Sequence, residues 1–282
     1  TPNMEEFLYV NDLPRHISYP KNRIKVLLLE NVHPDAFQKL SKDGFTVETV
    51  KTSLSEEELI QKIKGVHVLG IRSKTQITQK VLDAADKLMT VSAFCIGTTQ
   101  IDLEACKKKG VTVFNAPYSN TRSVVELAIG EIIMLMRSIF PRSTEIHNGQ
   151  WNKTAANSRE VRGKNLGIVG YGNIGKQLSV LAEAMGMHVY FYDVNDQLSI
   201  GNATKIDSLE ALLGMSDVVS LHVDDNKANK NFFDSQAFGA MKPGSLFVNL
   251  ARGFVVNIEA LVAALKSGHI AGAAIDVYPE EP

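Results

Sequence analysis

The stretch Gly170-Tyr171-Gly172-Asn173-Ile174-Gly175 decides how the second half of this chain folds. It follows the apolar run 164–169 and opens a segment with helical spacing. In a strand, loop and helix of this kind, one glycine allows the tight turn, one lets a pyrophosphate approach the backbone, and one lets helix and strand pack closely. The start of the helix offers free N–H groups to an anion. We interpret the stretch as a dinucleotide-binding loop; a plain structural turn is the alternative.

An acid stands where such a loop needs one. Asp193 follows the β-rich run 188–192 and lies 18 residues after Gly175. This is near the usual spacing of about 20 for the carboxylate that binds the adenosine ribose hydroxyls. Because a carboxylate there repels a 2′-phosphate, Asp193 favours NAD over NADP as the cofactor.

Around this motif, short β-rich runs alternate with helical patterns, which predicts two doubly wound α/β domains with parallel sheets. We expect an N-terminal extension at residues 1–22, which contain three prolines, and a flavodoxin-like substrate-binding domain at residues 23–119. Residues 120–282 then form a Rossmann NAD-binding domain. Five strands can be recognised in that domain where a complete one has six, so we expect it to be incomplete, lacking its last element. The cleft between the domains is the expected place for substrate.

The longest apolar stretch runs from Val124 to Phe140. Its apolar positions recur at helical spacing, and Asn120 or Thr121 could cap its start. We therefore expect one long buried helix joining the two domains. The stretch is too short and too charged to span a bilayer.

Composition is ordinary for a soluble globular protein. A net charge of −1 gives no general attraction to nucleic acid or to anionic lipid, so neither partner is expected. Cys95 and Cys106 are the only cysteines in the chain. Two cysteines without a secretory leader fit a reducing cytosol, and we expect a cytoplasmic protein with unpaired thiols.

Candidate ligand-binding loops follow the predicted strands, because open α/β sheets bind ligands at the carboxyl ends of their strands. In the first domain, Arg72-Ser73-Lys74 places two cations around a hydroxyl, which suits a phosphate or carboxylate. A solvated turn is the alternative.

In the second domain, Arg252 follows the apolar run 245–250 and is expected beside the nicotinamide, where it can clamp a carboxylate and polarise a carbonyl. A surface arginine at a strand end is the alternative. Asp276 could contact the cofactor amide and Glu281 could orient a histidine base, or either could cap a loop.

These motifs together resemble the D-isomer-specific 2-hydroxyacid dehydrogenase family, from about residue 23 to the end of the chain. The stretches that carry the resemblance are 69–75, 94–98, 114–124, 151–153, 170–175, 241–244, 251–253 and 272–277. Members of this family pass a hydride from C2 of a hydroxy acid to NAD while a histidine removes the hydroxyl proton.

The resemblance implies a role for individual residues and calls for no metal ion. Arg252 and Glu281 would be catalytic; the substrate would be bound by Arg72, Ser73, Lys74 and Asn120; NAD would be lined by Gly170, Gly172, Asn173, Ile174, Gly175, Asp193, Leu250, Ala251 and Asp276. The resemblance also implies a small-molecule substrate, a phosphorylated 2-hydroxy acid, and a homo-oligomer. Two alternatives stay open, namely another D-2-hydroxy acid such as a dicarboxylate, and a non-catalytic scaffold that senses NAD.

Three departures from the family pattern stand out. Lys74 occupies a position where a second arginine is expected, which keeps the charge and loses the bidentate fork. Asp224 replaces an expected proline. The family's histidine lies about two dozen residues beyond its glutamate, whereas this chain ends one residue after Glu281. We therefore expect a fragment that lacks the catalytic histidine and is itself inactive, with His222 serving in packing.

Overall fold

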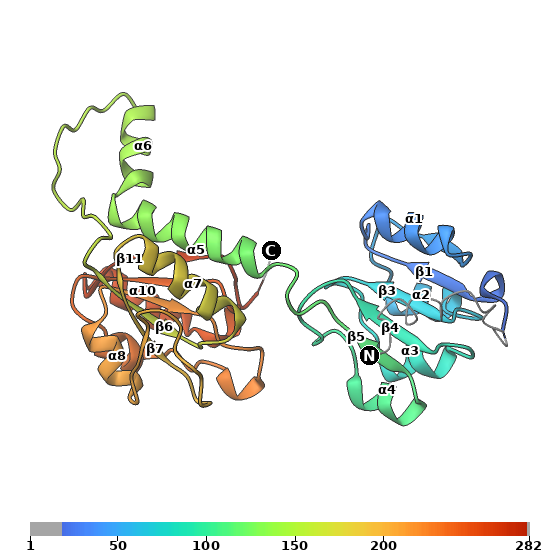
Figure 1. The fold of residues 1–282 in the computed structure, drawn as a ribbon. Coiled ribbons are helices and arrows are strands. Elements are labelled where there is room, and N and C mark those ends of the chain that lie inside the picture. Colours follow the sequence, from blue (N-terminus) through green and yellow to red (C-terminus); the bar gives the residue numbers. More distant parts are fainter. Residues whose placement is uncertain (1–18, 281–282) are drawn as a thin grey trace, which may run out of the picture. The chain divides into compact units, whose positions relative to one another are not determined.

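The chain divides into two compact units, with the boundary between Pro117 and Tyr118, here called unit 1 and unit 2. The computed structural model describes residues 19–280, and each unit is an α/β structure built on one parallel sheet (Figure 1). This confirms the predicted fold class. Most of the expected N-terminal extension and Glu281 lie outside the described residues.

Unit 1 contains a five-stranded sheet in the order β2-β1-β3-β4-β5. All of its strand pairs are parallel. The strands are β1 (Lys25–Leu28), β2 (Thr46–Thr49), β3 (Val68–Ile71), β4 (Thr90–Ala93) and β5 (Thr112–Phe114). This is the flavodoxin-like order, in which the chain reverses direction across the sheet beside β1 and β3.

Local signals set the helices of unit 1. Ser55 and Glu58 form the capping box that the sequence suggests: Ser55 Oγ accepts from Glu58 N at 3.3 Å, and Glu58 Oε2 accepts from Ser55 N at 2.9 Å. Gly110, with φ of 71°, ends α4 in the left-handed conformation that glycine adopts at little cost. The helices are α1 (Pro34–Lys42), α2 (Glu56–Lys62), α3 (Gln79–Ala84) and α4 (Leu103–Lys109).

Unit 2 contains a six-stranded parallel sheet in the order β11-β10-β9-β6-β7-β8. The strands are β6 (Asn165–Val169), β7 (His188–Tyr192), β8 (Thr204–Lys205), β9 (Val218–Leu221), β10 (Ser245–Asn249) and β11 (Ile270–Ile275). Numbered within the unit, this is the Rossmann order 3-2-1-4-5-6. The expectation of a sheet lacking its last strand is therefore wrong. The strand that the sequence does not reveal is β8, which is only two residues long and leaves no periodic pattern to read.

The helices of unit 2 follow the alternation that the sequence predicts. They are α5 (Thr121–Met136), α6 (Ile139–His147), α7 (Asn173–Ala184), α8 (Leu209–Met215), α9 (Ser235–Ala240) and α10 (Ile258–Lys266).

The prediction of one long buried helix over residues 124–140 is wrong in two respects. The helix breaks after Met136, and Ser138 takes a left-handed conformation with φ of 52° before α6 starts. Pro141 explains the break, because in a continuous helix its ring would collide with the carbonyl of Arg137. The helix is also buried on one face only, since Leu127 and Met134 of α5 are exposed.

Three phenylalanines form the centre of one of the cores of unit 2. Phe233, Phe238 and Phe247 are almost completely buried, and their ring centroids lie 4.8 to 5.0 Å apart. Two of the three pairs meet edge to face, an arrangement that adds to the free energy gained by burial. This cluster packs β10 against α9 and against the segment that precedes α9.

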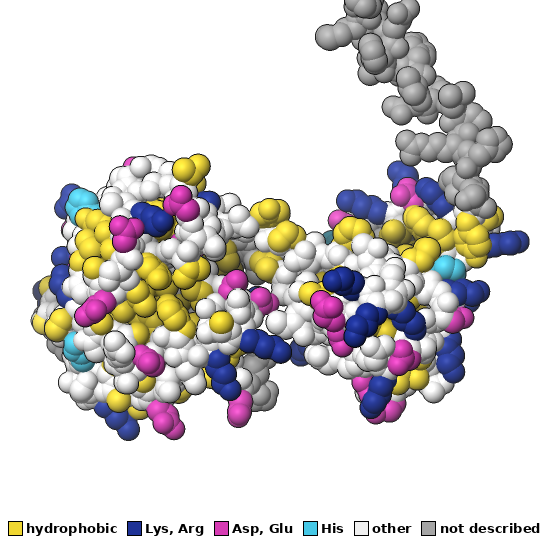
Figure 2. All heavy atoms as spheres, turned by 90° about the horizontal axis from the view of Figure 1, so that it is seen from below, with side chains coloured by type: hydrophobic (Ala, Val, Ile, Leu, Met, Phe, Trp, Pro, Cys, Tyr) yellow, Lys and Arg dark blue, Asp and Glu magenta, His cyan; other side chains and the backbone are white. Residues whose placement is uncertain are grey.

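On the surface, Figure 2 shows basic and acidic side chains interspersed on both units. No helix within residues 19–280 combines the length and the apolar character needed to cross a membrane. Cys95 and Cys106 are both free thiols, and burial raises the pKa of Cys106.

Phe247→Ala is expected to lower the free energy of unfolding of unit 2 by about 3–5 kcal/mol, because the substitution leaves a cavity in the phenylalanine cluster. Leu198→Ala, at a highly exposed position, is the matched control and should change it by less than about 0.5 kcal/mol. Urea unfolding followed by circular dichroism measures both. Equal effects of the two variants would contradict the assignment of this core.

Candidate functional site

The glycine loop lies where the topology of unit 2 predicts a ligand. It joins β6 to α7, and β6 pairs with β7 on one side and with β9 on the other. The chain changes direction across the sheet between β6 and β9, and such a switch point leaves a crevice at the carboxyl ends of the strands.

Each glycine of the loop has a separate geometric role. A Cβ on Gly170, which has φ of 93°, would lie 2.6 Å from the carbonyl oxygen of His222, and a Cβ on Gly175 would lie 2.4 Å from the carbonyl oxygen of Gly170. Both glycines therefore permit close packing of backbone on backbone. A Cβ on Gly172 would meet nothing within 4 Å. Gly172 precedes α7 and makes no side-chain cap, so the open space faces the free N–H groups of a helix start.

Tyr171, inside the glycine loop, is a residue whose role sequence reasoning missed. Its ring is fully buried and stacks on Phe191 at a centroid distance of 3.7 Å. Its hydroxyl pairs with Ser179 Oγ at 2.7 Å and accepts from Ile200 N at 3.4 Å. Tyr171 thus ties the glycine loop to α7 and to the segment after β7. The sequence shows only an aromatic residue between two glycines. A loop has no apolar periodicity from which the burial of this residue could be predicted.

Asp193 borders a cavity of about 420 Å³ at this edge of the sheet. Its Oδ2 accepts from Tyr171 N at 2.7 Å and its Oδ1 accepts from Asn195 N at 2.8 Å. A carboxylate has about four acceptor positions, so Asp193 can still receive hydroxyl donors. The cavity is lined by Val169, Gly170, Gly172, Tyr192, Asp193, Val194, Asn195, Gln197, His222, Val223, Asp224, Asn226, Asn229 and Phe232.

The residues present fit a dinucleotide, because the open space at Gly172, the helix start and an acid with spare acceptor positions border the same crevice. Asn173 and Ile174, also predicted to line the cofactor, form the first turn of α7.

His222 lines the same cavity, yet it is held as a structural residue. Its Nε2 lies 2.8 Å from Ser220 Oγ, and burial lowers the pKa of His222 to about 4. The ring is therefore neutral at physiological pH. Its Nδ1 is buried and has no hydrogen-bond partner among the described residues, which is consistent with packing against the glycine loop.

Arg252 lies on a turn shaped by Asn249, a second residue whose role sequence reasoning missed. Asn249 is buried; its Oδ1 accepts from Ala251 N at 3.0 Å, and its Nδ2 donates to the carbonyl of Arg252 at 3.2 Å. A Cβ on Gly253 would lie 2.0 Å from the carbonyl carbon of Tyr278. The Arg252 turn is therefore in close contact with the segment that follows β11.

The side chain of Arg252 is 38% exposed. Its Nη1 donates to the carbonyl of Ala251 at 2.8 Å, and its Nη2 lies 3.8 Å from Asp225 Oδ2. Asp224, the residue in place of the expected proline, organises the same loop: its Oδ1 accepts from Asn226 N at 3.2 Å and from Asn229 Nδ2 at 2.8 Å.

The other predicted cofactor residues differ in accessibility. Asp276 is exposed at the end of β11, and its N–H donates to the carbonyl of Asn249 at 3.1 Å. Burial raises the pKa of Glu131 on α5, and the negative charge of Asp276 raises it further. The side chains of Leu250 and Ala251 are buried in the core.

In unit 1, Arg72, Ser73 and Lys74 follow β3 and line a cavity of about 440 Å³. Lys51, which follows β2, contributes a third cation that sequence reasoning missed. The strand order explains it: β2, β1 and β3 are neighbours, so the loops at their carboxyl ends meet. The cavity is lined by Glu30, Asn31, Lys51, Thr52, Ser53, Arg72, Ser73 and Lys74.

Glu30 holds these loops together. It is buried in a left-handed conformation with φ of 61°, and its carboxylate accepts from the N–H groups of Lys74 at 3.0 Å and Thr75 at 2.8 Å. Burial opposes its ionisation, but the hydrogen bonds from Thr75 and Lys74 hold the pKa of Glu30 below its ordinary value. The carboxylate of Glu30 is therefore bound to backbone N–H groups. The side chains of Lys51, Arg72 and Lys74 remain available to bind an anion.

Gln100 holds the backbone of the Arg72 loop through a hydrogen bond. Its Nε2 donates to the carbonyl of Arg72 at 2.7 Å and to Cys95 Sγ at 3.4 Å. Cys95 thus helps to shape the loop. Asn120, the fourth predicted substrate residue, does not line this cavity; it belongs to unit 2 and precedes α5 without capping it through its side chain.

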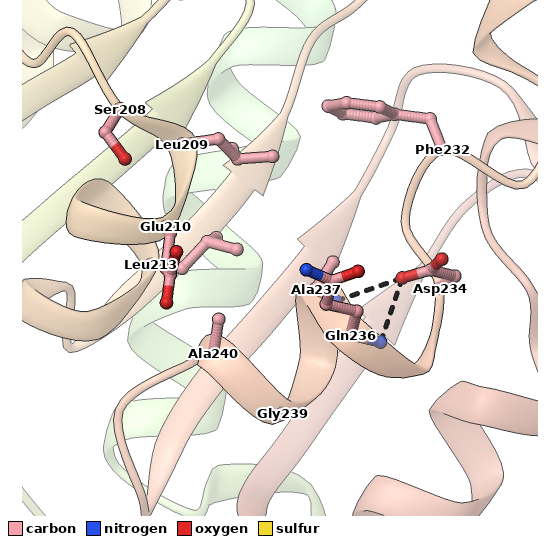
Figure 3. A pocket seen from close by; sticks show the side chains of 10 residues that line it. All are labelled: Ser208, Leu209, Glu210, Leu213, Phe232, Asp234, Gln236, Ala237, Gly239 and Ala240. Atoms are coloured by element: carbon pink, nitrogen blue, oxygen red, sulfur yellow. Dashed lines mark hydrogen bonds between the residues drawn. The ribbon is translucent and has the colours of Figure 1, made fainter.

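A larger hollow of about 590 Å³ lies between α8 and α9. Figure 3 shows Leu209 and Leu213 extending from α8 toward the α9 side. Two of its polar side chains are helix caps: Ser208 Oγ accepts from Ala211 N, and Asp234 Oδ1 accepts from Gln236 N and Ala237 N. No predicted site residue lines this hollow. Residues 19–280 also contain no group of three or more histidine, cysteine, aspartate or glutamate side chains able to hold a metal ion.

Gly172→Ala is expected to leave unit 2 folded and to weaken NADH binding about tenfold or more, because the added methyl group occupies the space through which a pyrophosphate approaches the helix start. Fluorescence titration with NADH measures the affinity, and thermal unfolding checks the fold. Gly175→Ala is the contrasting variant, since its Cβ meets backbone and should destabilise the unit. Unchanged affinity in Gly172→Ala would show that the dinucleotide does not pass this point.

Comparison with known proteins bears on both units. Residues 129–282 match the model of the D-isomer specific 2-hydroxyacid dehydrogenase, NAD binding domain. The chain is 52% identical over 267 residues to the D-3-phosphoglycerate dehydrogenase of Escherichia coli K12, covering 94% of this chain and 65% of that protein. The chain spans 56% of the length of a Schizosaccharomyces pombe relative and 65% of the length of the Escherichia coli protein.

Solved structures agree with this match. The TT0316 protein from Thermus thermophilus is 29% identical and has a TM-score of 0.85, with 92% of this chain and 83% of that chain covered. D-lactate dehydrogenase from Aquifex aeolicus, complexed with NAD and lactic acid, is 26% identical and has a TM-score of 0.78, with 90% and 77% covered. The chain belongs to the D-isomer specific 2-hydroxyacid dehydrogenase family, and its unit 2 carries the NAD-binding domain of that family.

Proposed function

We propose that this chain forms the substrate-binding and NAD-binding part of a D-3-phosphoglycerate dehydrogenase. The reaction is the NAD-dependent oxidation of D-3-phosphoglycerate to 3-phosphohydroxypyruvate, which begins serine biosynthesis. The observation that carries the choice of substrate is the cavity in unit 1 lined by Arg72, Lys74 and Lys51. The 52% identity to the Escherichia coli protein of that name supports it.

The charges of this cavity suit a phosphate monoester. Three cations and the carboxylate of Glu30 line it, which leaves a net charge of about +2, and a phosphate monoester carries about −1.5 to −2 at pH 7. Because Lys74 is a point charge where an arginine fork is expected, the site relies less on a planar, bidentate partner. A dicarboxylate such as a hydroxylated diacid is the second candidate, since its distal carboxylate would also pair with these side chains.

NAD supplies the hydride acceptor when it is bound. The chain's own residues would hold it: the N–H groups at the start of α7 would bind its pyrophosphate, with Gly172 leaving the approach open, and Asp193 would accept hydrogen bonds from the ribose hydroxyls. A 2′-phosphate in place of a hydroxyl would meet the negative charge of Asp193. NAD is therefore preferred to NADP.

Arg252 is proposed to bind the substrate carboxylate and to polarise the oxygen on C2. A guanidinium presents five N–H donors, so Arg252 can keep its bond to Ala251 and still donate to a ligand. Developing negative charge on the oxygen is then stabilised by a donor already in place. Asp276 is proposed to accept from the cofactor amide. Glu281, proposed to orient a histidine base, lies outside the described residues.

A homo-oligomer is proposed from the apolar surface of α6 and the segment after it, which stand out from the rest of unit 2 (Figure 1). Phe140 is 71% exposed and Trp151 is 77% exposed, and Ile139 and Ile146 are also exposed. Large apolar side chains gathered within the thirteen residues 139–151 are typical of a protein interaction surface, and a second copy is the simplest partner. A cytoplasmic location is proposed because both cysteines are free thiols.

The intact protein is expected to form NADH from D-3-phosphoglycerate. Lys51→Met should raise KM for this substrate about tenfold or more, because a hydrogen bond to a charged group is lost. The same variant should leave KM for an unphosphorylated 2-hydroxy acid unchanged. Lys42→Met, on the exposed end of α1, is the control for loss of one positive charge. No turnover of D-3-phosphoglycerate at saturating NAD, together with turnover of a dicarboxylic hydroxy acid, would favour the second candidate.

The protein is expected to sediment as a dimer or larger assembly. Phe140→Asp with Trp151→Ser should shift it toward the monomer, because both changes remove apolar surface that a second copy would bury. Analytical ultracentrifugation over a range of concentrations measures the shift. Val194→Ser, at another highly exposed apolar position, is the control. An assembly that both changes leave intact would place the interface elsewhere.

A further inference from the structure

Asp225 of unit 2 has no role in the proposed mechanism, yet it faces Arg252. Asp225 lies in the loop after β9, and Arg252 lies in the turn after β10. β9 and β10 are neighbours in the sheet, so these two loops meet at the carboxyl edge. Asp225 Oδ2 is 3.8 Å from Arg252 Nη2, and both side chains are about one-third exposed. Within residues 19–280, Asp225 is the one acid in ion-pair contact with Arg252.

Hydrogen bonds hold the two turns that bring Asp225 and Arg252 together. On one side, Asp224 closes a turn by accepting from Asn226 N and Asn229 Nδ2. On the other side, the Arg252 turn is fixed by the two side-chain hydrogen bonds of Asn249. Asp225 therefore lies in a hydrogen-bonded loop within unit 2, and its contact with Arg252 does not involve either terminus of the chain.

We propose that Asp225 is a specificity-determining residue: it is an internal counter-ion of Arg252 that the carboxylate of a ligand must share or displace. The nature of the ligand, a 2-hydroxy acid, rests on the proposed function. Two carboxylates that compete for one guanidinium repel each other, so the internal one weakens every anion that binds there.

As a consequence, Asp225 makes the site select ligands by the strength of their contact with Arg252. A simple monocarboxylate replaces the carboxylate of Asp225 with another carboxylate and gains little. A 2-hydroxy or 2-oxo acid adds the oxygen on C2 to the oxygens of its carboxylate, so the guanidinium gains one more acceptor and the contact is stronger. Asp225 thus favours ligands with an oxygen on C2 at the expense of overall affinity, and it leaves the arginine paired in the absence of a ligand.

Asp225→Asn is the test, made in the intact protein with D-3-phosphoglycerate and NAD. KM for the hydroxy acid is expected to fall about two- to fivefold, the range of a partly exposed ion pair, while kcat stays within about twofold. NADH affinity, measured by fluorescence titration, should not change. Asp225→Glu restores the charge and should bring KM back toward the wild-type value. Glu210→Gln removes one exposed charge from α8 and is the control.

A KM that is unchanged or raised in Asp225→Asn would overturn the proposal, because Asp225 would then be inert or would serve to orient Arg252. The ion pair is also tested without substrate, by a double-mutant cycle of Asp225→Asn and Arg252→Gln in thermal unfolding. A coupling of about 2 °C in Tm is expected, and zero coupling would overturn the proposal. If the wild-type protein does not oxidise D-3-phosphoglycerate, the proposed function fails, and the cycle still decides the role of Asp225.

Discussion

The close approach of two backbones at Gly170 is the constraint on which the dinucleotide site depends. The carbonyl of His222 fills the space where a Cβ would stand, so the loops after β6 and β9 can meet only if this residue is glycine. These strands flank the point where the chain changes direction across the sheet. The contact between their loops closes the crevice on the side of the sheet, and the crevice stays open at Gly172. Burial of His222 follows from the same contact, and with it the low pKa that keeps the imidazole neutral. The histidine is thus part of the wall of the site, and its chemistry is suppressed by the packing that forms the site.

Each unit uses a carboxylate to hold backbone beside its ligand pocket. In unit 1, Glu30 accepts from the N–H groups of Lys74 and Thr75; in unit 2, Asp193 accepts from those of Tyr171 and Asn195. A buried carboxylate is costly unless donors surround it, and loop N–H groups are donors that cannot move away. The left-handed conformation of Glu30 is a small cost that the same hydrogen bonds offset. With the acids satisfied by backbone, the cations of unit 1 remain free to bind a ligand anion.

The sequence predicted the elements with strong local signals and missed those set by tertiary contacts. The glycine loop, the capping box at Ser55 and the alternation of strands and helices carry their information in adjacent residues, and the structure agrees with each of them. The strand β8 has two residues and no pattern, so only its pairing with β7 defines it. Pro141 indicates the helix break at Ser138, but the apolar run around it favours a continuous helix, and the prediction followed the apolar run. Lys51 enters the cation cavity because β2 is next to β1, a fact of strand order that no local pattern carries.

The loop after β9 shows why residue type alone does not assign a role. Asp224 and Asp225 are adjacent acids, yet one bonds to neighbouring amides and the other faces a guanidinium. A proline at 224 would fix φ and stiffen the turn through the backbone itself. Asp224 achieves a similar turn through side-chain hydrogen bonds, so the loop keeps its shape without that ring. Of these two acids, Asp225 is the one whose charge faces Arg252. The turn that carries Arg252 is shaped in turn by Asn249, a neutral residue that holds the arginine's backbone without competing for its charge. At this edge of the sheet, Asp224 and Asn249 shape the two turns through their hydrogen bonds, and Asp225 supplies the carboxylate that pairs with Arg252.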